Sequence, residues 1–178
     1  LATVNLRLGN AGVVATSLKG FIQKYPTIFE GYSILGDALR VQRDFNAALA
    51  LYNEIEKRFP GREQTSLYRG MILKELGKPA EARAAFEQAL SRNPNSTAAI
   101  DQLVDLDIEA KNFTGAQRRL DAILIARPDV PELHVARARL YMVQGDTAKM
   151  EASLRDALKI NPDLTQPYML LARIYIES

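Results

Sequence analysis

The stretch Ala89–Pro94, ALSRNP, closes a helix-like run with a proline, and endings of this kind return along the chain. Phe21–Pro26 (FIQKYP) and Ile55–Pro60 (IEKRFP) close in the same way, and the series continues at Pro128 and Pro162. Successive prolines of the series are 34 residues apart, without insertions. Proline cannot continue a helix and restricts the residue before it, so each one marks a helix end. A fixed period of this length predicts a repeat array.

Alignment on these prolines divides the chain into repeats. Full repeats cover Phe29–Arg62, Glu63–Ser96, Thr97–Val130 and Pro131–Leu164, and partial units cover residues 1–28 and 165–178. Each full repeat holds two runs with apolar residues at helical spacing, separated by a short polar turn such as Arg43–Asn46. We therefore predict an all-α chain of about eleven antiparallel helices, forming one array over residues 1–178. Because both outer units are incomplete, we expect a fragment of a longer array.

Local signals support the predicted helix boundaries. Pro79 suits the first turn of a helix, where its missing N–H costs nothing. Gly145 suits a left-handed helix C-cap, and Asp146 can cap the helix that follows. Small residues also recur four positions after the opening apolar residue of the first helix, for instance at Gly36 and Gly70. We expect two helices to approach closely at these points.

This pattern resembles the tetratricopeptide repeat (TPR) family of 34-residue helix–turn–helix units. The resemblance covers the whole chain. Its residues are the small ones of the first helix (Gly36, Gly70, Ala138, Ala172), the alanines of the second (Ala48, Ala82, Ala116), the aromatic residues that follow (Tyr52, Phe86) and the terminal prolines. The resemblance implies a right-handed α-solenoid with a concave groove lined by the first helices. The Ala-rich helices look like those of bacterial TPR proteins.

Two polar residues occupy positions that are apolar or aromatic in other repeats. Asp107 stands where Leu39 and Leu73 stand elsewhere. Since a buried unpaired carboxylate is costly, we expect Asp107 either to reach solvent or to pair with Arg118 or Arg119. His134, the only histidine, is interpreted as a packed side chain between helices, not as a ligand or a catalytic base.

Composition excludes several classes of function. The chain has 178 residues, 23 Lys+Arg, 21 Asp+Glu and no cysteine. This nearly balanced charge argues against a nucleic-acid partner, and the lack of cysteine excludes disulfides and thiolate metal sites. The sequence contains no apolar run of the roughly 18 residues that a membrane span needs. These features fit a cytoplasmic or a bacterial periplasmic protein equally well.

The sequence shows no catalytic, cofactor or metal constellation. Asp101 and Asp105 form a carboxylate pair, but they lie one turn apart on one helix, whereas paired catalytic carboxylates normally face each other across a cleft. The glycines between Gly9 and Gly20 form no phosphate-binding motif. We therefore predict a chain that is not an enzyme.

The groove is the predicted partner site. Residues beside the packing stripe of each first helix should face it, and their mixture of apolar and charged side chains suits a protein or peptide segment. The predicted partner-binding residues are Asp37, Arg40, Leu67, Tyr68, Met71, Asp101, Asp105, Arg139, Met142 and Arg173. We expect Arg139 to face an acidic group of the partner, and its replacement by alanine to leave stability almost unchanged.

One TPR subfamily binds the carboxylate ends of large chaperones through Lys, Asn and Arg side chains on successive first helices. The matching positions here are Ser33, Asp37, Tyr68, Ala98 and Gln102, or one repeat later Leu67, Met71, Gln102, Glu132 and Ala136. Neither set supplies this clamp, which disfavours binding of that kind.

The sequence thus predicts a noncatalytic protein-interaction scaffold. Two alternatives remain open: a regulatory TPR region of a larger enzyme or of a bacterial envelope export or assembly machine, and a scaffold that assembles through its ends. The second alternative follows from Tyr168, Leu171 and Tyr175, which we expect to lack a covering helix.

Overall fold

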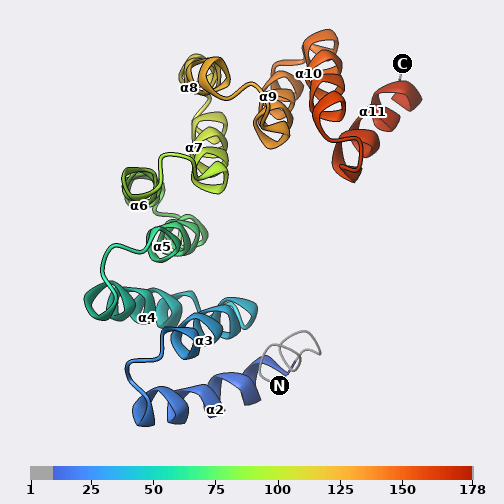
Figure 1. The fold of residues 1–178 in the computed structure, drawn as a ribbon. Coiled ribbons are helices and arrows are strands. Elements are labelled where there is room, and N and C mark those ends of the chain that lie inside the picture. The colour runs from blue at the N-terminus through green and yellow to red at the C-terminus, as the bar shows by residue number, and fades with distance from the viewer. Residues whose placement is uncertain (1–9, 178) are drawn as a thin grey trace. The chain divides into compact units, whose positions relative to one another are not determined.

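The computed structural model describes residues 10–177, which form ten α-helices and no strand (Figure 1). The first helices of the repeats are α3 (Phe29–Val41), α5 (Glu63–Glu75), α7 (Thr97–Glu109), α9 (Pro131–Gln144) and α11 (Thr165–Glu177). The second helices are α2 (Ala11–Lys24), α4 (Phe45–Arg58), α6 (Pro79–Arg92), α8 (Phe113–Ala126) and α10 (Thr147–Ile160). The predicted all-α class is confirmed. The eleventh predicted helix would precede α2 and lies outside the described residues.

The recurring prolines end the second helices as expected. Each second helix stops two residues before its proline, as α4 does at Arg58 before Pro60. The residue between them leaves the helical conformation, which is the restriction that a following proline imposes. At α4 this residue is Phe59, whose N–H still donates to the carbonyl of Ile55 at 2.8 Å.

The turns between paired helices use side-chain caps. Asp44, Asn112 and Asp146 each accept a hydrogen bond from the backbone N–H three residues later, at 3.0–3.1 Å. Gly145 has φ of 74° at the C-cap of α9, so its predicted left-handed role is confirmed, as is the capping role of Asp146. The turn predicted at Arg43–Asn46 is shorter than expected, because Asp44 caps α4 directly and the helix begins at Phe45.

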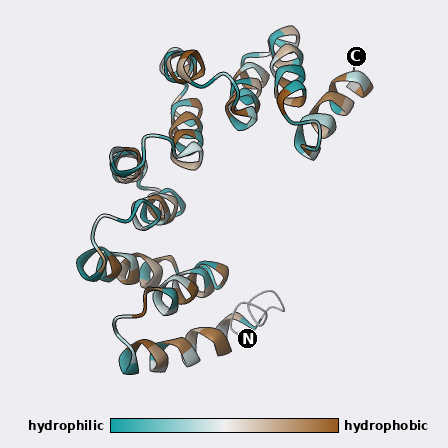
Figure 2. Ribbon diagram, in the orientation of Figure 1, coloured by the Kyte–Doolittle hydropathy of each residue, from teal (hydrophilic) through white to brown (hydrophobic). Residues whose placement is uncertain are grey.

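The chain divides into two compact units, Leu1–Ser96 and Thr97–Ser178, at a boundary between two expected repeats. In the first unit, each helix from α2 to α5 packs against the next one. In the second unit, consecutive helices pack in the same way, and the first helices α7 and α9 also contact each other. Figure 2 shows hydrophobic and hydrophilic residues alternating along the helices, as expected for helices with one buried side. A single array over residues 1–178 stays a prediction.

Close helix contacts explain the small residues of the repeat. A Cβ atom added to Gly36 would lie 2.4 Å from the hydroxyl oxygen of Tyr52, and one added to Gly70 would lie 2.4 Å from the ring of Phe86. Tyr52 and Phe86 are almost fully buried on the second helix of the same repeat. The aromatic ring of the second helix therefore fills the space that glycine leaves on the first.

Both unusual polar residues are buried and partnered. Asp107 is 2% exposed and pairs with Arg119 at 3.4 Å, so the pairing alternative holds and the solvation alternative is wrong. The ring of His134 contacts the carbonyl oxygen of Pro128 at 2.7 Å and the guanidinium of Arg137 at 3.1 Å. At the equivalent position of an earlier repeat, the Tyr32 hydroxyl donates to the carbonyl of Pro26 at 3.3 Å. The interpretation of His134 as a packed side chain is therefore confirmed.

The last helix exposes part of its apolar surface. Tyr168 and Tyr175 are 52% and 54% exposed, as expected for residues without a covering helix. The expectation for Leu171 is wrong: it is buried, because it packs with Ala138, Met150 and Leu154 of the preceding helices. End-to-end contact between copies stays a prediction.

Alanine substitutions at two helical glycines should have opposite effects. Gly70→Ala should lower the free energy of unfolding by roughly 1–3 kcal/mol, because the new methyl group overlaps Phe86. Gly20→Ala on α2 should raise it by roughly 0.5–1 kcal/mol, because nothing lies within 4 Å of the added Cβ and alanine favours the helix. Urea titration followed by circular dichroism measures both changes. Equal effects of the two substitutions would show that the close contact does not determine the repeat.

Candidate functional site

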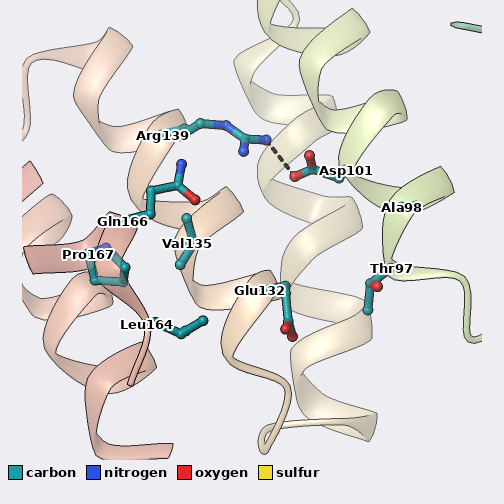
Figure 3. Close-up of a pocket in the computed structure, with 9 residues that line it drawn as sticks. All are labelled: Thr97, Ala98, Asp101, Glu132, Val135, Arg139, Leu164, Gln166 and Pro167. Carbon is teal, nitrogen blue, oxygen red and sulfur yellow. Dashed lines mark hydrogen bonds and ion pairs between the residues drawn. The ribbon is translucent and has the colours of Figure 1, made fainter. Parts of the chain in front are cut away.

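The second unit contains a cavity of about 210 Å³ among its first helices (Figure 3). Its lining residues are Thr97, Ala98 and Asp101 near the start of α7, Glu132, Val135 and Arg139 on α9, and Leu164, Gln166 and Pro167 around the start of α11. None of them comes from a second helix. The cavity therefore lies on the face of the second unit to which all three first helices contribute.

The repeat places equivalent residues around this cavity. Ala98, Glu132 and Gln166 are 34 residues apart and follow the first residue of α7, α9 and α11 in turn. Asp101 and Val135 are equivalent to each other in the same way. Since one repeat position supplies the same part of the lining on each helix, side-chain identity at that position sets the chemistry of the cavity.

An ion-pair cluster closes one side of the cavity. The Nη2 atom of Arg139 donates to Asp101 Oδ1 at 2.5 Å and to Asp105 Oδ1 at 2.9 Å (Figure 3 draws the first of these). Burial disfavours the charged guanidinium, but the two carboxylates outweigh this and raise the pKa of Arg139 above its ordinary value. The cluster links α7 to α9 and keeps a permanent cation beside the cavity.

The structure thus brings three predicted site residues together, Asp101, Asp105 and Arg139. The expectation that Arg139 faces an acidic group of the partner finds no support in this geometry, because its guanidinium is already held by two carboxylates of the chain. Met142 and Arg173 are exposed on α9 and α11 but do not line the cavity.

Predicted residues of the first unit form a separate cluster. Arg40 pairs with Asp37 at 3.1 Å, and its guanidinium carbon lies 5.1 Å from the centroid of the Tyr68 ring. The Tyr68 ring in turn lies 5.5 Å from that of Tyr52. Partial burial raises the pKa of Asp37 above its ordinary value, and Arg40 offsets part of that effect. Burial also raises the pKa of Tyr52, so this phenol stays neutral.

The remaining predicted residues of the first unit, Leu67 and Met71, are partly buried on α5. The residues missed by the prediction belong to the N-terminal turns of the first helices, such as Ala98, Glu132 and Gln166. They precede Asp101 and its equivalents by one turn. Extending the helical spacing by one turn toward the N-terminus would have found them.

Over residues 10–177, no group of three or more histidine and carboxylate side chains is arranged to hold a metal ion. Within the same residues, no helix is long and apolar enough to cross a membrane. The chemistry of the cavity is thus that of a mixed apolar and charged binding surface.

Two tetratricopeptide repeat models match the sequence, one over residues 73–140 and the other over residues 131–174. Together they span more than half of the chain, and they include all the residues that line the cavity. The chain belongs to the tetratricopeptide repeat family. Repeats of this family imply a protein–protein interaction scaffold.

The similar proteins agree with this assignment. DnaJ homolog subfamily C member 3 of Gallus gallus is 26% identical over 161 residues, which are 82% of this chain and 30% of the relative. A tetratricopeptide repeat protein from Parabacteroides merdae has 21% identity and a TM-score of 0.73, covering 98% of this chain and 70% of that one. A thermophilic TPR protein of Thermus thermophilus has 18% identity and a TM-score of 0.75, covering 99% and 96%.

These comparisons confirm the predicted α-solenoid class of 34-residue repeats. Both solved structures are of bacterial proteins, consistent with the bacterial style of the repeats. The chain spans less than a third of the curated relative that it matches.

The ion-pair cluster changes what we expect of Arg139. Arg139→Ala should lower the free energy of unfolding by about 1–2 kcal/mol, because it leaves Asp101 and Asp105 close together without their shared cation. Arg118→Ala on the exposed side of α8 should change it by less than about 0.5 kcal/mol. Urea titration compares the two variants. Equal stability of both would show that the cluster contributes nothing to the contact between α7 and α9.

Proposed function

We propose that the chain is a noncatalytic scaffold that binds an extended segment of a partner protein at the cavity of its second unit. The observation that carries this proposal is the cavity itself, lined by three first helices and by both apolar and charged side chains. Its volume of about 210 Å³ is below the range of roughly 300–1,000 Å³ typical of sites for small molecules. It suits one or two side chains of a longer segment that continues along the surface.

Apolar contacts in the cavity come from Val135, Leu164 and Pro167, and polar contacts from the ion-pair cluster and Gln166. Val135 and Pro167 are nearly buried, so they form a fixed wall whose position does not depend on the partner. A preformed wall lowers the entropy cost of binding. An extended segment can place alternate side chains into such a site while its backbone stays at the surface.

A second candidate role follows from the curated relatives. Their name, DnaJ homolog subfamily C member 3, points to proteins of a chaperone system, so a co-chaperone-like role for this chain is a proposal beside the general one. The missing chaperone-tail clamp argues that such a role would use another kind of segment than a carboxylate end. Both candidates use the same cavity.

Filling the cavity tests the proposal. Ala98 is exposed and lines the cavity, whereas Ala122 is exposed on the second helix α8 of the same unit. A phage-displayed library of random dodecapeptides selected on the wild-type chain should yield binders. Ala98→Trp should weaken their binding at least about tenfold, because the indole occupies the space of the partner side chain. Ala122→Trp should leave the affinity unchanged.

Fluorescence anisotropy with the selected peptides gives the dissociation constants, and thermal melting shows that both variants fold. Failure to select any peptide, or equal affinities for the two variants, would contradict binding at the cavity.

A further inference from the structure

The charges around the cavity determine which partner side chain fits it. Three carboxylates, Asp101, Asp105 and Glu132, lie on or beside its lining, against one guanidinium, that of Arg139. Their formal balance is −3 + 1 = −2. Arg173, the cation of the next repeat, does not belong to the lining. The cavity is therefore an acidic site within a chain of nearly balanced charge.

The carboxylates keep acceptor capacity that the chain does not use. Asp101 is bound to Arg139 through Oδ1, and within residues 10–177 its Oδ2 atom accepts no hydrogen bond. Glu132 is exposed and forms no ion pair or hydrogen bond with any described side chain. By contrast, the Arg139 Nη2 atom already donates to two carboxylates. A cation entering the cavity meets unused acceptors, whereas an anion would have to displace Asp101 or Asp105.

Helix termini do not reverse this balance. The start of a helix carries about half a positive charge, and α7, α9 and α11 all begin near the cavity. Glu132 is in the first turn of α9 and already complements the charge of that terminus. The full charges of the carboxylates decide the preference, because the partial charges act only over the first turn.

The apolar lining lies between the charged groups. Figure 3 shows Val135 between the Arg139–Asp101 pair, drawn above it, and Glu132 and Leu164, drawn below it. A side chain with an apolar stem and a cationic end matches this order, since its methylene groups can pack on Val135 and Leu164 while its end reaches a carboxylate.

We propose, on the basis of the function proposed above, that the cavity takes a lysine or arginine side chain of the partner segment, between Asp101 and Glu132. Asp101 and Glu132 bind the cationic end, and Arg139 holds Asp101 in position from α9. The partner is thus a protein segment with a basic residue next to apolar ones. This preference is opposite to that of the clamp for chaperone carboxylate ends.

The selected peptides test the charge of the ligand. We expect them to share a lysine or arginine flanked by apolar residues. A synthetic peptide of the most enriched sequence should lose at least about tenfold in affinity when this residue is replaced by glutamine, and more when it is replaced by glutamate. Its affinity should also fall as salt rises.

Variants of the chain identify the carboxylates. Glu132→Gln should weaken the basic peptide about fivefold or more and leave its glutamine analogue unchanged, and Asp101→Asn should act in the same direction. Glu132→Gln is the cleaner variant, because it breaks no contact within the described residues. Glu87→Gln, at an exposed position of α6, is the matched control and should change neither affinity.

Each contrary result has its own meaning. Selected peptides rich in aspartate or glutamate, or a full affinity of the glutamine analogue, would overturn the cationic ligand and leave peptide binding at the cavity intact. Unchanged binding of the basic peptide to Glu132→Gln and Asp101→Asn would do the same. Peptides that bind Ala98→Trp normally would overturn the proposed function itself.

Discussion

The structure depends on the close approach of two helices within each repeat, at a point where one of them has no side chain. Tyr52 lies against Gly36, and Phe86 lies against Gly70, at distances that leave no room for a methyl group. This contact fixes the distance between the helices of a pair. The proline that follows each second helix then fixes where the next pair begins, because it stops the helix at a constant position. Repetition of these two constraints places the first helices at a regular interval.

The regular interval also produces the cavity. Because equivalent residues of α7, α9 and α11 meet there, a change at one repeat position alters the lining without disturbing the contacts within helix pairs. Ala98, Glu132 and Gln166 show how different residues can occupy one such position. The Arg139 cluster adds a contact between α7 and α9 that the repeat itself does not require. Binding chemistry and packing are thus carried by different residues of the same helices.

The helices and their ends could be predicted because they follow from local signals: proline at the stop, Asp146 and Gly145 at the turn, and apolar residues at helical spacing. Contacts between repeats were less accessible to prediction. The spacing did not reveal that Arg139 pairs with Asp101, 38 residues earlier, because the pattern places both on a groove face but does not say which charges meet. For the same reason the spacing does not distinguish Arg118 from Arg119 as the partner of Asp107. The prediction for Leu171 is wrong because its cover comes from the preceding pair of helices.

The central claim is that a partner segment binds on the first helices of the second unit, at their N-terminal turns. The most direct measurement is the change in amide chemical shifts of the ¹⁵N-labelled chain on addition of a selected peptide. The account predicts that the largest changes fall on Ala98, Glu132, Val135 and Gln166 and that α8 and the exposed side of α10 change little. Large changes confined to α8 and α10, with Ala98 and Gln166 unaffected, would contradict it.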